Sequence, residues 1–117
     1  MAEADPSVGE DLADRGKVIL LQTIGRHSGQ PVTTAVGFVP EDDGSLLVAA
    51  TDDTTNWARN LLANPRCHVT LAGQTTERIA TLLDGSERDT AIVSLILIYG
   101  TPAERLGRGP AFRLVAR

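Results

Sequence analysis

The chain of 117 residues is 42% hydrophobic and 22% charged, which predicts one globular domain with a single core. Its net charge of −4 argues against a protein that coats nucleic acid, and its single cysteine excludes an internal disulfide and a CxxC metal site. The two histidines lack metal-ligand spacing, so we expect no metal. The longest apolar run, 95–99, is too short to cross a bilayer, and no signal-peptide pattern opens the chain. These features predict a cytoplasmic protein without a membrane span.

The predicted elements begin after an acidic, weakly patterned N-terminal segment, 1–16, which we expect to be partly mobile. The folded domain is expected to span 17–117. Six runs that are rich in β-branched residues or alternate in polarity predict strands: 17–24, 32–39, 45–51, 66–71, 75–83 and 111–115. Turn signals between the first three strands predict an antiparallel meander.

Two helices are predicted between these strands. The first, over 55–63, follows several candidate N-caps and ends before Pro65, because the residue before a proline avoids the α region. The second starts at 84–86 and is apolar on every side from Ala91 to Tyr99. Such a helix is typical of a buried position or a subunit interface, so we expect a homodimer. Together the elements predict an α+β fold built as a small antiparallel barrel.

The loop of the first predicted hairpin has the residues of a ligand-binding site. Gly25 and Gly29 bracket Arg26, His27 and Ser28. Glycine allows a close approach of the backbone to a bound group, and successive backbone N–H groups can bind an anion. The guanidinium of Arg26 suits phosphate or carboxylate. The alternative is a polar hairpin loop in which the glycines only make the turn.

Three motifs, in this order, resemble those of a known family. They are Thr-x-Gly-Arg-x-Ser-Gly-Gln-Pro at 23–31, Leu-Val-Ala-Ala-Thr at 47–51 and Asn-Trp-x-x-Asn-Leu-x-Ala-Asn-Pro at 56–65. Together they resemble the deazaflavin (F420)-dependent nitroreductase family of the split β-barrel, flavin-reductase-like superfamily. The resemblance implies a split β-barrel of about six mainly antiparallel strands with two helices. It also implies an oxidoreductase that passes a hydride between F420 and a small organic acceptor such as a quinone, an enone or a nitro compound.

The resemblance also implies which residues hold the cofactor. The phosphate and carboxylate tail would be held by the hairpin loop: Gly25, Arg26, His27, Ser28 and Gly29. The edge of the ring would be lined by the end of the third strand: Ala49, Ala50 and Thr51. The start of the first helix would close over the site with two side chains: Trp57 and Asn60. Trp57 is also expected to anchor this helix in the core.

The charge pattern does not decide whether the chain binds F420, FMN or no cofactor. Relatives usually have a second basic residue where this chain has Val32, and a lysine or glycines where it has Asp52 and Asp53. These differences remove positive charge from the expected tail site and add negative charge to it.

Few catalytic residues can be nominated, because the cofactor carries the chemistry of hydride transfer. Tyr99 could donate a proton, and Asp52 or Asp53 could act as a general acid or base. The structural alternative is that Tyr99 closes the second helix and the aspartates cap the first. A competing function is a split barrel without deazaflavin, acting as a cofactor-independent isomerase or cyclase or as a small-molecule binding protein. A third is a purely structural dimer subunit.

Overall fold

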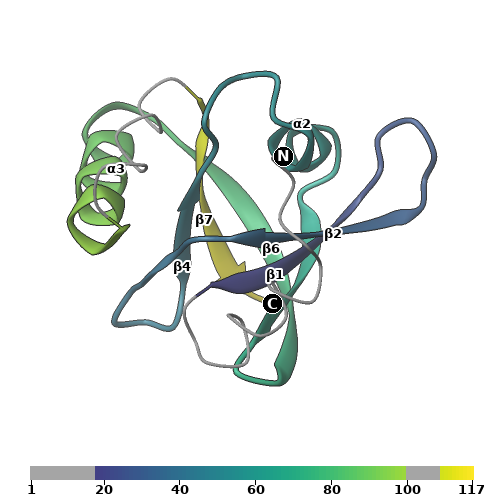
Figure 1. Ribbon diagram of the computed structural model, residues 1–117, viewed down its shortest axis with the longest axis horizontal. Helices are drawn as coiled ribbons and strands as arrows, with labels where there is room; N and C mark the ends of the chain where they lie inside the picture. The colour runs from purple at the N-terminus through teal and green to yellow at the C-terminus, as the bar shows by residue number, and fades with distance from the viewer. Residues whose placement is uncertain (1–17, 100–108) are drawn as a thin grey trace.

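The computed structural model describes residues 18–99 and 109–117, and these form seven strands and two helices (Figure 1). In chain order they are β1 (Ile19–Ile24), β2 (Pro31–Val36), β3 (Val39–Pro40), β4 (Leu46–Ala49), α2 (Asn56–Ala63), β5 (Arg66–Leu71), β6 (Gln74–Leu83), α3 (Gly85–Tyr99) and β7 (Ala111–Ala116). The predicted N-terminal segment at 1–16 and residues 100–108 lie outside the described residues, so the predicted domain boundary stays a prediction.

The strands form one curled antiparallel sheet in the order β2-β1-β5-β6-β7-β4-β3 (Figure 1). This confirms the predicted α+β split barrel with two helices. The sheet has one strand more than the six predicted, because the run 32–39 is interrupted at Gly37 and Phe38 and gives two strands.

The first three strand runs form two antiparallel hairpins, β1–β2 and β3–β4, at opposite ends of the sheet, so the continuous meander predicted is wrong. β1 and β2 do form a hairpin, but β4 pairs with β3 and β7, at the other end of the sheet. The physical reason is that β4 is buried along its whole length and needs partners on both sides, whereas the first three residues of β2 are exposed. The strand at 111–116 supplies the missing partner, with Leu46 opposite Leu114.

Two apolar clusters lie on opposite faces of β4. Leu46 and Val48 belong to the larger cluster, which also contains the buried face of α2. Leu47 and Ala49 belong to the smaller one, which contains the buried face of α3. Alternate residues of a strand point to opposite faces, so one short strand contributes to both cores. α2 and α3 therefore lie on different sides of this part of the sheet (Figure 1).

Helix α2 confirms the helix predicted over 55–63. Trp57, Ala58 and Leu61 are buried against the sheet, and the ring centroid of Trp57 lies 6.1 Å from that of Phe112 at an interplanar angle of 56°. This tilted arrangement is favourable for an aromatic pair. The helix ends at Ala63, as expected before Asn64 and Pro65. Trp57 is thus a core anchor, as predicted.

Helix α3 is only half buried within one chain. Ala91, Ile92 and Leu95 pack into the smaller cluster, but Val93, Leu97 and Ile98 are 55%, 81% and 55% exposed. Within one chain the helix is thus buried on one face only, the face that the sheet covers, and the predicted subunit interface stays a prediction. No helix in the described part of the chain combines the length and the apolar character needed to span a membrane.

Candidate functional site

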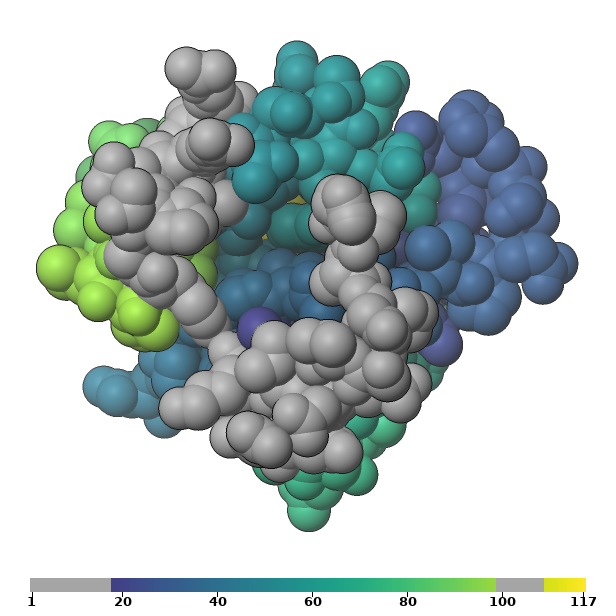
Figure 2. Space-filling model, in the orientation of Figure 1, coloured from purple at the N-terminus to yellow at the C-terminus, as the bar shows by residue number. Residues whose placement is uncertain are grey.

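The loop between β1 and β2 stands out from the body of the molecule beside α2 (Figure 2). Its shape is fixed by backbone hydrogen bonds of 2.8 Å from Gly25 N to Gln30 O and from Gly29 N to Gly25 O. Gly29 has a φ of 72°, and a Cβ on Gly25 would lie 2.6 Å from Ser28 Oγ. The positive φ favours glycine at position 29, and a side chain at position 25 would force the Ser28 hydroxyl to move. His27 is exposed, and the exposed Ser28 accepts a hydrogen bond from Gln30 N at 3.1 Å.

The side chain of Arg26 donates hydrogen bonds to amide oxygens of Asn56 and Asn60 on α2. Its Nη1 lies 2.9 Å from Asn60 Oδ1 and 3.4 Å from the carbonyl of Asn56, and its Nη2 lies 3.3 Å from Asn56 Oδ1. Its backbone N–H also donates to Asn60 Oδ1, at 3.2 Å. These partners are neutral oxygens, so they orient the guanidinium without cancelling its charge.

Asn60 connects the loop, the helix and the first strand. Its side chain is 3% exposed, and its Nδ2 donates to the hydroxyl of Thr23, which is fully buried, at 3.1 Å. Its Oδ1 accepts the two hydrogen bonds from Arg26. All polar atoms of this buried amide therefore have protein partners, and Asn60 positions Arg26.

The segment between β4 and α2 is shaped by Asp52. Its Oδ1 accepts hydrogen bonds from Thr54 N at 2.8 Å, Thr54 Oγ1 at 2.6 Å and Thr55 Oγ1 at 3.4 Å. These bonds, above all those from the Thr54 hydroxyl and backbone, lower the pKa of the Asp52 carboxyl below its usual value. A carboxylate stabilised in this way is a weaker base, and its geometry is that of a turn at a helix start.

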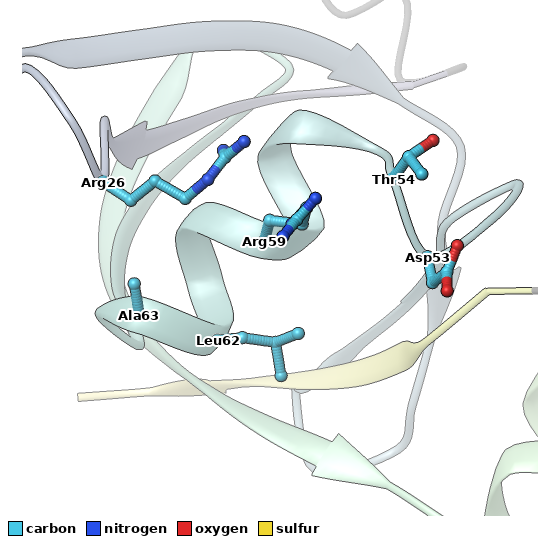
Figure 3. Close-up of a pocket in the computed structure, with 6 residues that line it drawn as sticks. All are labelled: Arg26, Asp53, Thr54, Arg59, Leu62 and Ala63. Carbon is cyan, nitrogen blue, oxygen red and sulfur yellow. The ribbon is translucent and has the colours of Figure 1, made fainter.

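A pocket of about 500 Å³ lies along the outer face of α2 (Figure 3). Its lining comes from the hairpin loop, the β4–α2 segment and the helix: Arg26, Asp53, Thr54, Arg59, Leu62 and Ala63. Two guanidinium groups and one carboxylate give the lining a net positive charge, although the whole chain is acidic. The pocket can therefore accept an anion, with apolar contact from Leu62 and Ala63.

The pocket brings together two residues predicted for the site, Arg26 and Asp53, and adds four. Arg59 carries most of the new chemistry. The helical periodicity places it on the face opposite Trp57 and Leu61, so the sequence indicates that it is exposed. Its position beside Arg26 depends on how the hairpin loop packs on α2, which no local pattern in the sequence gives.

Other predicted site residues lie in different surroundings. Ala49 and Ala50 are 6% and 1% exposed and pack in the two cores, and Ala50 N donates to Pro110 O at 2.9 Å. Thr51 is exposed, with its hydroxyl 3.3 Å from that of Thr55. Tyr99 is the last residue of α3. The described residues contain no group of three His, Cys, Asp or Glu side chains placed to hold a metal ion.

Comparison with known proteins gives a family and a fold. The F420H(2)-dependent quinone reductase family matches residues 1–99. An F420-H2 dependent reductase, FDR-A, superposes with a TM-score of 0.70 at 24% identity, over 84% of this chain and 93% of that chain. HutZ, the heme storage protein of Vibrio cholerae, superposes with a TM-score of 0.72 at 21% identity, over 98% and 91%. A heme binding protein of Mycobacterium smegmatis gives 0.69 at 16% identity, over 97% and 53%.

No curated protein matches the sequence significantly. The structural likenesses establish the split-barrel fold alone, because proteins named for different ligands share it. The sequence match covers most of the chain and confirms the resemblance inferred from the motifs. The chain therefore belongs to the F420H2-dependent quinone reductase family, a family of oxidoreductases that use the deazaflavin cofactor F420.

Proposed function

We propose that this chain transfers a hydride from reduced F420 to a small organic acceptor of the quinone type, and that the pocket on α2 holds the anionic tail of the cofactor. The family match supports the cofactor and the acceptor class. The observation that carries the proposed site is the pairing of Arg26 and Arg59 at one pocket, in a chain whose net charge is −4.

The residues present fit the tail. Phosphate and carboxylate groups are bound best by guanidinium groups that keep free donors and are not already paired with a carboxylate. Among the described residues neither Arg26 nor Arg59 makes an ion pair, whereas Arg113 and Arg117 do. Of the side-chain nitrogens of Arg26, Nη1 and Nη2 contact α2, which leaves the Nε–H for a ligand.

When bound, the deazaflavin supplies the hydride, and the protein orients it and the acceptor. Arg26, fixed by Asn60, gives the tail a rigid contact. The exposed Thr51, two residues after β4, is the candidate for a polar contact with the ring among the three positions expected to line it, since Ala49 and Ala50 are buried. Asp53 is a better acid–base candidate than Asp52, whose Oδ1 already accepts three hydrogen bonds.

The test is a titration of the purified protein with F420, followed by absorbance or fluorescence of the deazaflavin. Arg26→Ala should raise the Kd about 10- to 150-fold, corresponding to about 1.5–3 kcal/mol for a charge-assisted hydrogen bond. Asp53→Asn should lower the Kd, because it removes a repelling charge from the lining. Arg66→Ala, an exposed arginine on β5 outside the pocket, serves as the control and should leave the Kd unchanged.

The activity test follows oxidation of reduced F420 by a quinone with the same four proteins. An unchanged Kd for Arg26→Ala would place the tail elsewhere. Absence of saturable binding by the wild type would reject the reductase and favour the other reading of the sequence, in which the split barrel works on a small molecule without deazaflavin.

The dimer predicted from the sequence is proposed to form through the outer face of α3. Val93, Leu97 and Ile98 form an exposed apolar stripe there, and burying it between two copies would be favourable. Leu97→Lys should shift a dimer to monomer in light scattering at tens of micromolar. Val32→Lys, which adds the same charge on the far edge strand β2, should not. A monomeric wild type would refute this interface.

A further inference from the structure

We propose that Arg59 is a second, adjustable anion-binding residue of the pocket, and that it contacts a phosphate or carboxylate of the cofactor tail beside Arg26. This inference rests on the proposed function, because it concerns the same pocket. It adds a residue of α2 to the hairpin loop, 25–29, from which the tail site was predicted.

The first step is the position of Arg59 on the helix. Its backbone N–H donates to the carbonyl of Thr55, the N-cap residue of α2, at 3.0 Å, so its Cα is held by regular helix. Trp57, Leu61 and the other buried residues hold the opposite face of that helix against the sheet. Arg59 therefore extends from a rigid base into the pocket, on the side where Arg26 reaches over the helix (Figure 3).

The second step is its lack of a protein partner. Arg113 is paired with Glu41 and Glu87, and Arg78 donates to the carbonyls of Gly44 and Leu114. In the described part of the chain the guanidinium of Arg59 has no hydrogen bond or ion pair of this kind, although it lines a concave pocket with a second guanidinium. Two like charges that share one pocket repel each other, and an anion bound between them removes that cost.

The third step is the difference between the two arginines. Arg26 is fixed by three side-chain contacts with Asn56 and Asn60, so its guanidinium can bind a group at one position only. Arg59 keeps the freedom of a long exposed side chain and can follow an anion that varies in position. One fixed and one mobile guanidinium can together bind a flexible ligand that carries several negative charges. They suit such a ligand better than they suit a small, compact anion.

The fourth step is the place of the negative charge in the lining. Asp53 comes from the segment before α2, and Figure 3 shows it away from Arg26, beyond Arg59 and past the start of the helix. The positive part of the pocket thus lies at the hairpin loop and the middle of α2, which is where we place the anion.

The experiment measures the Kd of three ligands by fluorescence titration at low ionic strength. The ligands are F420, the same deazaflavin with its phosphate and no glutamates, and the deazaflavin riboside, which has neither. The proteins are the wild type, Arg59→Gln, Arg59→Lys and the matched control Arg66→Gln, which removes one exposed positive charge outside the pocket. Each variant changes an exposed side chain, and thermal unfolding checks that the fold is retained.

Arg59→Gln should raise the Kd of F420 about 5- to 20-fold, a value below that of a buried contact because solvent screens an exposed one. Arg59→Lys should keep most of the affinity for F420, and Arg66→Gln should change the Kd of F420 by less than about 2-fold. None of the three variants should alter the Kd of the riboside. A penalty with the form that has only phosphate assigns Arg59 to the phosphate; a penalty with the full tail alone assigns it to a carboxylate. The penalty should shrink as salt is added.

Two results would overturn the inference, and they can be told apart. If the wild type binds F420 and Arg59→Gln matches Arg66→Gln, Arg59 has no role in binding while the proposed function stands. If the wild type binds none of the three ligands, the proposed function fails and this inference fails with it.

Discussion

Replacement of Asn60 by alanine tests the hydrogen bonds that hold the hairpin loop and Arg26 on α2. Asn60 is 3% exposed and makes three hydrogen bonds that join α2 to the hairpin loop and to β1. Alanine removes all three bonds and leaves the hydroxyl of Thr23, which is fully buried, without its donor.

The expected cost follows from the character of each bond. The bonds to Thr23 and to the backbone of Arg26 are neutral, at about 0.5–1.5 kcal/mol each, and the bond from the Arg26 guanidinium is charge-assisted, at about 1.5–3 kcal/mol. Because the guanidinium is partly exposed, we expect Asn60→Ala to lower the free energy of unfolding by about 3–5 kcal/mol in all. That is a large share of the stability of a domain of this size.

Urea unfolding followed by tryptophan fluorescence measures this quantity directly, since Trp57 is the single tryptophan and packs on Phe112. Asn56→Ala is the matched control. It lies one turn away on the same helix and also contacts Arg26, but it is exposed, so we expect a loss below about 1 kcal/mol.

The reasoning would be refuted if Asn60→Ala cost no more than Asn56→Ala. In that case the loop would be held by its own backbone bonds, and Asn60 would not position Arg26. If the reasoning holds, Asn60→Ala should also weaken F420 binding under conditions where the variant is still folded.

Three further predictions concern the core and its connections. Trp57→Ala should lower the free energy of unfolding by about 3–5 kcal/mol, and a loss below about 1 kcal/mol would mean that the ring is not a core anchor. Burial raises the pKa of the Cys67 thiol to about 11 from 9.0, so the thiol should resist Ellman's reagent at pH 8 until urea unfolds the chain. Because the unfolded thiol ionises first, stability should also fall as the pH rises from 9 to 11 in a buffered urea series, and Cys67→Ala should abolish that part of the decline. A Cβ on Gly109 would lie 2.6 Å from Ala50 O and 2.7 Å from Asp52 O, so Gly109→Ala should cost about 1–3 kcal/mol in thermal unfolding and weaken F420 binding; an unchanged melting temperature would contradict the close contact.

The secondary structure was largely predictable because its signals are local. The alternation of Cys67 and Val69 with exposed neighbours marks β5, and Pro65 marks the end of α2. The pairing of the strands could not be predicted, because β4 is apolar on both faces and its sequence does not indicate which strands lie beside it. Its partner β7 is more than half the chain away in sequence.

In the candidate site, too, the features set by local sequence could be predicted, and those set by packing between distant segments could not. The glycines of the hairpin loop and the position of Arg26 could be predicted from a short motif, because their requirements are set within the loop. The use of Asn60 to hold Arg26, and the approach of Arg59 to the same pocket, depend on packing between the loop and the helix. The outer face of α3 could not be predicted from its apolar pattern, which is equally typical of burial by the sheet and by another chain.

The position of β7 in the sheet has a consequence for how the chain folds. The hairpins β1–β2, β5–β6 and β3–β4 each join neighbouring segments, so they can form early and independently. The pair β3–β4 meets the rest of the sheet only through β7, among the strands described. Phe112 and Leu114, which are almost fully buried, come with that strand. Before it docks, the larger core is divided between two separate half-sheets, and closing it requires contacts between distant parts of the sequence, which are slow to form. We therefore expect docking of β7 to be the late step that commits the chain to its native fold.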